Sequence, residues 1–379
     1  MPDKPGVQTR AGAKLILVAL LSARLLLVAT GDALMHKAVQ ACAADSGYDF
    51  LYEKVAPALR LADLGFLNLE FPVAPKTGRP PKPFLFNAGP EAVSALARAG
   101  FNVFNLANNH AFDQGPHGLA ETCFHLDSIG VGFVGAGRTA AEAQKPLVLE
   151  KRGIRVAFLA YTTLLNIAGN SGDPARPRVN TFEEDSAKND ISRLRDSVDF
   201  IVVSLHWGNE YMNEPTPSQV AVAHELCDWG ADIILGHHPH VLGPVEIYTA
   251  KDGRRCVIAY TLGNFISNQE RTYCLKMPAE KGDPRDGVLL YIALVADSSG
   301  RSLEGPWAVP LWTENRNGII RPWPMKVFRA REPELIALRW RRVWEVLRLP
   351  EWRALGHCPL HEILVDLILG QCRRIPYHD

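Results

Sequence analysis

The sequence has no excess charge of either sign. Its 379 residues contain 41 Lys and Arg against 41 Asp and Glu, so the formal net charge is zero. Proteins that bind nucleic acid usually carry a clear basic excess, because binding must neutralise phosphates and release their counterions. We therefore expect no nucleic-acid partner.

The sequence also lacks a paired cysteine pattern. Its seven cysteines are an odd number and none are spaced as CxxC: they stand at 42, 123, 227, 256, 274, 358 and 372. This excludes the usual signs of a disulfide framework or a cysteine zinc site. Most of these residues are expected to be buried thiols, which favours a reducing compartment.

No apolar run reaches the roughly 20 residues that a membrane-spanning helix needs. The nearest candidate is LILVALLSA (15–23), which follows Lys4, Arg10 and Lys14 and is interrupted by Arg24. It predicts a signal-like or anchor-like segment over residues 1–23, the alternative being an apolar extension packed on the body. This segment favours a location outside the cytoplasm, whereas the cysteine content favours a reducing compartment. A membrane-associated or extracytoplasmic location is favoured over a cytoplasmic one.

Phosphate-loop fingerprints are absent as well. The GAG at 135–137 has neither the full glycine pattern nor a downstream acid, so it indicates a turn. This weakens the hypothesis of a nucleotide-binding enzyme.

What the sequence does contain is a repeated alternation of apolar runs and helical segments. Helical patterns at 89–100 and 218–230 both end at glycine, as helix C-termini commonly do. Near-continuous apolar strands alternating with helices predict an α/β fold. The strands are expected at 24–32, 64–70, 101–110, 155–161, 199–210 and 231–240.

Later segments follow a different pattern. The runs at 256–267 and 287–297 have no clear helix between them and predict a second, largely antiparallel sheet. Beyond residue 326, Trp, Leu and Arg recur at helical spacing. We expect one main domain over 24–326 and a helical C-terminal extension over 327–379.

Polar residues stand where each apolar run ends. Ligand sites of open α/β sheets lie beyond the carboxyl ends of the strands, so these side chains should meet at one edge. They are Asp32, Glu70, Asn108, Asn109, His110, His206, His237, His238 and His240. Imidazole and carboxylate together suit Mn, Fe or Zn, whereas oxygen ligands alone favour Mg or Ca. The sequence therefore predicts a site for one or two divalent metal ions.

The segment IILGHHPHVLGP (233–244) has three histidines directly behind an apolar run. His238 and His240 are two positions apart, so an extended segment would place them on one side. Pro239 between them restrains the turn. A pair of ions would need a bridging carboxylate, for which Asp32 and Glu70 are the candidates.

Six motifs occur in an order that resembles the bacterial capsule-synthesis (CapA, poly-γ-glutamate synthesis) family over roughly residues 24–326. They are GD (31–32), NLE (68–70), LANNHAFDQG (106–115), SLHWGNEY (204–211), GHHPHV (236–241) and TLGNF (261–265). That family is similar to the calcineurin-like metallophosphoesterases. The resemblance implies a four-layer αββα sandwich of two sheets flanked by helices.

The resemblance also implies roles for individual residues. Asp32 looks like the first-strand ligand and Glu70 like the bridging acid. Asn109 and His110 would be the catalytic pair, Asn109 also as a ligand and His110 beside the scissile phosphate. His206, His238 and His240 would complete the metal shell, with His237 in reserve. Apart from the resemblance, the positions of two further residues suggest that Glu210 orients a histidine and that Asn264 reaches the site from the second sheet.

The sequence departs from the phosphoesterase pattern in two places. No histidine stands two residues after Asp32, the nearest being His36, and NLE replaces a GDxxD motif and supplies a single carboxylate. Fewer anionic ligands imply weaker metal binding or one ion instead of two. Other rim residues have structural alternatives: core and wall packing is favoured for Trp207 and Tyr211 over a platform for a substrate chain, and tying the loop is favoured for Asp113 over catalysis.

These observations predict a metal-dependent, phosphoesterase-like hydrolase acting in synthesis or export of an anionic capsule polymer such as poly-γ-glutamate. Its partners would be that polymer or a phosphorylated substrate, together with membrane polymer-synthesis proteins. The alternative is a non-catalytic scaffold or polymer-binding subunit that has kept the fold and part of the ligand set.

Overall fold

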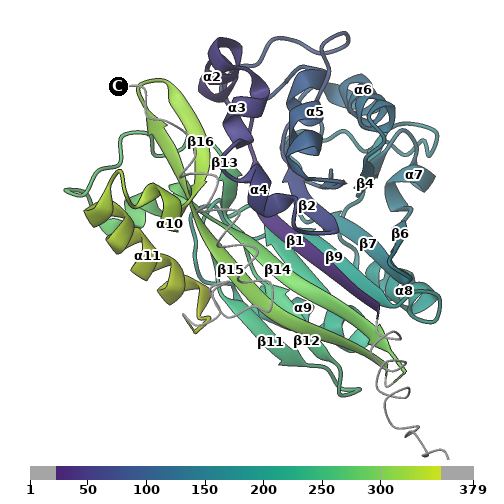
Figure 1. Cartoon of the computed structure of the whole chain (residues 1–379). Helices are drawn as coiled ribbons and strands as arrows, with labels where there is room; N and C mark the ends of the chain where they lie inside the picture. Colours follow the sequence, from purple (N-terminus) through teal and green to yellow (C-terminus); the bar gives the residue numbers. More distant parts are fainter. Residues whose placement is uncertain (1–22, 299, 351–379) are drawn as a thin grey trace, which may run out of the picture.

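A computed structural model describes residues 23–298 and 300–350. Two sheets pack face to face with helices on their outer sides, so the predicted four-layer αββα sandwich is confirmed (Figure 1). The first sheet has the order β16-β15-β14-β1-β2-β3-β4, and β13 also pairs with β1. Its strands are β1 (Ala23–Ala33), β2 (Leu64–Leu69), β3 (Val103–Asn105), β4 (Gly132–Val134), β13 (Asn264–Ile266), β14 (Asp286–Asp297), β15 (Gly300–Arg316) and β16 (Ile319–Pro324).

The second sheet has the order β11-β12-β10-β9-β7-β6. Its four inner strands are parallel, and the two edge strands are antiparallel to their neighbours. The strands are β6 (Leu147–Lys151), β7 (Ile154–Thr162), β9 (Phe200–His206), β10 (Ile233–His237), β11 (Val245–Thr249) and β12 (Arg255–Ala259). A separate ribbon pairs β5 (Ala136–Gly137) with β8 (Arg178–Val179).

The main core lies between the two sheets, where Phe66 of β2 stacks on Phe158 of β7 at 5.9 Å between ring centroids. From Leu25 onward β1 is buried at every position, as expected for a strand covered on both faces. Helices of the first half of the chain cover the first sheet: α2 (Lys37–Ser46), α3 (Tyr48–Tyr52), α4 (Ala56–Leu59), α5 (Pro90–Ala99) and α6 (Gly115–Ser128). The short α7 (Ala140–Gln144) packs on the β5–β8 ribbon.

A second apolar cluster lies on the outer face of the second sheet. There α8 (Glu184–Arg195) and α9 (Pro217–Trp229) pack on β9 and β10. The predicted helix at 218–230 corresponds to α9 and the one at 89–100 to α5. Both end at a glycine with positive φ, Gly230 at 131° and Gly100 at 132°.

The prediction that 256–267 and 287–297 form one antiparallel sheet is wrong. β12 joins the second sheet, parallel to β10, whereas β14 joins the first sheet, antiparallel to β1. An apolar run specifies a buried strand but not its partner. The intervening segment crosses between the sheets and contributes β13 and the short helix η1 (Ala279–Arg285) on the way.

The C-terminal part of the described chain is helical, with α10 (Met325–Phe328) and α11 (Pro333–Leu347). The apolar face of α11 is buried in the main core through Leu335, Ile336, Val343 and Leu347. Residues 351–379 and 1–22 lie outside the described residues, so the division at 23 and 326 stays a prediction. Within the described part, no helix is long and apolar enough to cross a membrane.

Candidate metal centre

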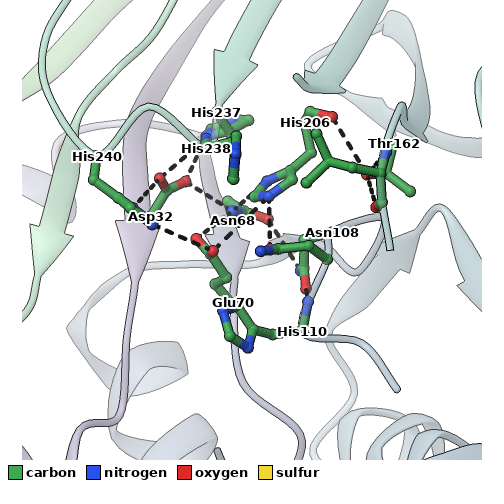
Figure 2. Close-up of polar contacts among 12 residues, drawn as sticks. Asp32, Asn68, Glu70, Asn108, His110, Thr162, His206, His237, His238 and His240 are labelled. Carbon is green, nitrogen blue, oxygen red and sulfur yellow. Dashed lines mark hydrogen bonds and ion pairs between the residues drawn. The ribbon is translucent and has the colours of Figure 1, made fainter. Parts of the chain in front are cut away.

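The carboxyl ends of strands from both sheets meet at one buried place (Figure 2). Asp32 ends β1, Glu70 follows β2, His206 ends β9 and His237 ends β10. All four side chains are fully buried. The strand register brings them together, because His206 pairs with His237 across β9 and β10, and Asp32 pairs with Asn264 across β1 and β13.

Two glycines allow the segment at 260–264 to cross these strand ends closely. A Cβ on Gly31 would lie 1.8 Å from the carbonyl oxygen of Gly263, and one on Gly236 would lie 1.9 Å from that of Tyr260. No other residue fits at either position without moving the backbone. The GD and GHH motifs therefore combine a close backbone approach with the polar residue that follows it.

The HPH segment is a turn, which corrects the expectation of an extended conformation. His238 has a φ of 96° and His240 a φ of 59°, a region that residues other than glycine rarely adopt. The two rings nevertheless lie 5.8 Å apart. Strained backbone of this kind concentrates at functional sites, where surrounding contacts must hold it.

Asp32 contacts all three histidines of the segment at 237–240. Its Oδ2 accepts from the backbone N–H of His238 at 3.2 Å and lies 3.1 Å from His240 Nδ1. Its Oδ1 lies 3.3 Å from His237 Nδ1. Although burial acts to raise the pKa of Asp32, the contacts with His237 and His240 hold it well below its usual value. Asp32 is therefore an anion within the core.

Glu70 faces the same space from β2. Its Oε1 lies 3.8 Å from the Nε2 atoms of both His206 and His240, and it makes no hydrogen bond within the described structure. Burial and the neighbouring charge of Asp32 raise the pKa of Glu70 well above its usual value. The protein alone therefore resists two anions at this position, and a cation between them would relieve the repulsion.

The rings of His206 and His238 are neighbours, with their centroids 4.9 Å apart and their planes tilted by 54°. His206 Nε2 lies 2.9 Å from Oδ1 of Asn109. Burial and the neighbouring His238 hold the pKa of His206 well below its usual value. Burial and His240 lower that of His238 to about 4. Both rings are neutral near pH 7, the form in which imidazole binds a metal ion.

The donor atoms form three overlapping groups, each with its atoms within 4.8 Å of one another. The groups are Glu70, His206 and His238; Asp32, Glu70 and His240; and Glu210, His238 and His240. Glu70 Oε1 and His238 Nδ1 are buried without a hydrogen-bond partner in the described structure. Since an unpaired buried polar atom is costly, these nitrogen and oxygen donors fit a divalent ion.

His110 lies at the edge of this cluster, next to Glu70 in Figure 2. Its Nδ1 lies 2.8 Å from Oδ2 of Asp113, and its Nε2 lies 3.5 Å from the side-chain amide nitrogen of Asn166. The same Asp113 oxygen accepts from the backbone N–H of Phe86, whose ring lies 4.5 Å from His110. Asp113 thus ties its loop, as expected, and also orients His110.

The residues expected to bind metal, Asp32, Glu70, Asn109, His206, His238 and His240, are all brought together. His237 is also buried here, but it lies behind Asp32 against Phe66 and takes part in none of the three groups. Glu210 is exposed and enters only the third group. Asn264 contacts His240 Nδ1 at 3.1 Å. It does so from β13 of the first sheet, which corrects the expectation that it comes from the second.

The aromatic residues of HWGNEY separate in the structure. Trp207 is buried and its indole N–H donates to the carbonyl of Tyr260, so it packs the wall of the site. Tyr211 is 51% exposed and its ring lies 6.3 Å from that of His240. Of these two aromatic residues, Tyr211 is therefore the one exposed beside the donor cluster.

Sequence analysis missed Asn68 and Asn166. Asn68 donates to Asp32 and Glu70 and contacts His206, and Asn166 contacts both Asn109 and His110. A signal for Asn68 was present, because residues two apart on a strand share a face and Asn68 precedes Glu70 by two. Asn166 lies in a loop, where no periodicity marks it.

Solved structures similar to this chain include phosphatases at low sequence identity. A phosphatase from Mycoplasma pneumoniae is 14% identical, covering 80% of this chain and 96% of that one with a TM-score of 0.43. A calcineurin-like phosphoesterase from Bacillus subtilis is 12% identical, covering 84% and 99% with a TM-score of 0.37.

Curated relatives are closer in sequence. The capsule biosynthesis protein CapA of Bacillus anthracis is 35% identical over 254 residues, and the PGA biosynthesis protein CapA of Bacillus subtilis is 32% identical over 274 residues. These matches cover 65% and 72% of this chain, and 60% and 68% of the relatives. A probable polyglutamine synthesis accessory protein of Mycobacterium tuberculosis is 32% identical over half of this chain.

Residues 26–269 match the model of the family described as bacterial capsule synthesis protein PGA_cap. This range contains every residue of the three donor groups. The chain therefore belongs to the bacterial capsule synthesis protein family.

Proposed function

We propose that this protein is a metal-dependent hydrolase that cleaves a phosphoryl or comparable ester during synthesis or export of an anionic capsule polymer such as poly-γ-glutamate. The observation that carries the proposal is the pair of unpaired buried atoms, Glu70 Oε1 and His238 Nδ1, within one cluster of donors. Burying two such atoms without a hydrogen-bond partner costs free energy unless a cation binds both.

Six residues would hold the metal: Asp32, Glu70, Asn109, His206, His238 and His240. When bound, one or two Mn, Fe or Zn ions would supply Lewis acidity and lower the pKa of water. Asp32 contributes a permanent negative charge, and Asn68 keeps it and Glu70 on the same side. The neutral rings of His206 and His238 offer lone pairs without adding charge.

His110 is the residue proposed to move a proton. Asp113 accepts from its Nδ1, which leaves Nε2 directed toward the substrate side, next to Asn166. In its doubly protonated form His110 would donate the Nε2 proton to the leaving oxygen, while Asp113 stabilises the charge on the ring. Tyr211, at the exposed edge, would contact the substrate chain.

The proposal that the protein acts in capsule synthesis rests on its similarity to relatives named for capsule and PGA biosynthesis. We propose an anionic polymer or a phosphorylated substrate as the ligand, and membrane proteins of polymer synthesis as partners. A membrane-associated or extracytoplasmic location is proposed with them.

One observation favours a second function. Asn68 donates to both Asp32 and Glu70 and so links the two acids without any ion. A non-catalytic scaffold or polymer-binding subunit with this fold would need no metal. The purified protein should therefore contain metal if it is the hydrolase, whereas a scaffold would not need any.

The test is metal analysis of the purified protein together with hydrolysis of generic phosphodiesters and monoesters. At least one tightly held ion is expected, and His238→Ala should lose both ion and turnover. His224→Ala is the matched control, because His224 is bound to Glu246 on the outer side of the second sheet. No stoichiometric metal and no turnover in the parent protein would reject the hydrolase and favour the scaffold.

A further inference from the structure

A second, separate pocket lies beside the start of α11, and we call it the α11 pocket. Its volume is about 580 Å³. Its lining includes four cationic side chains, one acidic side chain and the apolar side chain of Leu335. The charged residues are Arg271, Lys276, Arg285, Arg316 and Glu332. Glu332 is 4.0 Å from Arg316, which leaves three cations without an acid in the lining. The pocket is therefore strongly electropositive, although the chain as a whole is neutral.

Arg285 is the innermost of these cations and is only 6% exposed. Its Nε and Nη2 donate to a single neutral acceptor, the carbonyl oxygen of Thr313, at 3.0 and 2.9 Å. Its guanidinium carbon lies 4.2 Å from the centroid of the Trp312 ring. Among the described residues no carboxylate lies within ion-pairing distance of it. The neighbouring acids Asp283 and Asp286 are instead bound to Arg339.

A guanidinium buried without a direct ion pair is costly, and here burial lowers the pKa of Arg285 to about 10, against the opposing effect of the charges on Glu332 and Asp286. Its remaining amino group, Nη1, has no hydrogen bond among the described contacts. An anion in the pocket would accept a hydrogen bond from Nη1 and offset the cost of burying the charge. Arg271 and Lys276 are both exposed, so they can close on such an anion from the solvent side.

One segment joins the α11 pocket to the metal centre. Gln269 accepts from Asn264 at 2.7 Å and donates to the hydroxyl of Tyr211 at 3.3 Å, so it borders the metal centre. Two residues later Arg271 lines the α11 pocket. On the other side, Asn268 accepts from Asn315, which also lines the pocket, at 3.0 Å. Residues 268–271 thus contact the metal centre at one end and line the α11 pocket at the other.

We propose that the α11 pocket binds a carboxylate of a polyanionic chain whose reacting end lies at the metal centre. The identity of the chain as a capsule polymer rests on the proposed function, whereas the anion site rests on the pocket itself. A carboxylate can accept from Nη1, the arm of the Arg285 guanidinium fork that Thr313 leaves open, and regularly spaced carboxylates along one chain would bring the next one within reach of Arg271 and Lys276. The pocket lies beyond residue 269, outside the matched family region.

The test measures binding of γ-linked glutamate oligomers of increasing length by calorimetry, using the full-length, metal-loaded protein. Affinity is expected to rise once an oligomer is long enough to span from the metal centre to the pocket. Arg271→Gln/Lys276→Gln should then weaken binding of the long oligomers about tenfold and leave the shortest unchanged. Arg285→Lys, which keeps the charge but removes the fork, should weaken the same long oligomers.

The matched control is Lys145→Gln/Arg193→Gln, which removes two exposed cations far from α11. It should bind every oligomer as the parent does. Equal affinity of parent and pocket variants for the long oligomers would overturn the proposal, and so would equal weakening by the control pair. Inorganic phosphate that binds the pocket as tightly as the long oligomers would also overturn it, in favour of a site for a free oxyanion.

Binding heat does not require turnover. Loss of long-oligomer binding in the pocket variants therefore supports the α11 pocket even if the protein hydrolyses no ester. Unchanged binding rejects the pocket whatever the metal content. Thermal unfolding of each variant verifies that it is folded before binding is compared.

Discussion

The side-chain amide nitrogen of Asn68 donates to Oδ1 of Asp32 at 2.7 Å, across the register pair that these two residues form between β1 and β2. The same nitrogen lies 3.3 Å from Oε2 of Glu70. The side-chain oxygen of Asn68, Oδ1, accepts from the side-chain amide nitrogens of Asn105 and Asn108. This network fixes two carboxylates on one side of the site before any ion binds.

Replacing Asn68 by Ala should weaken metal binding about 10- to 100-fold, because residues that orient ligands contribute on this scale. Equilibrium metal titration measures it. Asn102→Ala is the control, since Asn102 bonds Gly65 and Asp63 near the opposite end of β2. Equal affinities of Asn68→Ala and parent protein would show that Asn68 does not orient the ligands.

Asp113→Asn should lower kcat on the order of 100-fold while leaving metal content unchanged. The asparagine oxygen can still accept from Phe86 and from Nδ1 of His110, but it carries no charge and therefore stabilises the doubly protonated ring of His110 less than the carboxylate does. Steady-state kinetics with a generic phosphodiester, together with metal analysis, separates the effect on His110 from loss of the ion. Unchanged kcat would remove His110 and Asp113 from the mechanism.

The free energy of unfolding should fall as pH drops from about 6.5 to about 4, in part through His36. Burial and the neighbouring His240 and His110 lower the pKa of His36 from 6.5 to about 4. Between these values the unfolded chain binds the proton and the folded protein does not, so stability is fully present above pH 6.5 and is lost on acidification.

Urea unfolding in the presence of a chelator measures this effect without a contribution from metal release. His36→Gln should reduce the slope by up to about 1.4 kcal/mol per pH unit in that window. Above pH 7 the curves of variant and parent should run parallel, because both side chains are then neutral. An unchanged slope below pH 6.5 would mean that His36 is protonated in the folded state.

Arg339→Met should destabilise the protein by about 3–5 kcal/mol, the usual cost of stripping a buried ion pair of one partner. Arg339 on α11 is fully buried and bonds both Asp283 and Asp286. Burial raises the pKa of Asp286 to about 7 even beside this arginine. The loss should therefore be larger at alkaline pH, where the unpaired carboxyl is charged.

Chemical denaturation at two pH values measures the loss. The control is Arg341→Met, on the exposed side of the same helix, which should change stability little. A loss in Arg339→Met no larger than in the control would show that this network does not hold α11 on the domain.

The sequence by itself determined the α/β class and the strands that carry the site. Apolar runs ending in Asp32, His206 and His237 mark buried strands, and parallel strands must bring their carboxyl ends to one edge. The helices closing at Gly100 and Gly230 were equally readable, because their signals are local. The ligand candidates followed from the same local pattern.

Only the tertiary structure decided the pairing partners and the loop contacts. The run at 256–267 crosses from one sheet to the other, and no local pattern encodes which strand it meets. His238 and His240 have positive φ in a turn that contacts Asp32, which stands more than two hundred residues earlier in the sequence. Asn166 and the α11 pocket likewise arise where distant loops meet. Such contacts follow from packing the whole chain, so periodicity cannot reveal them.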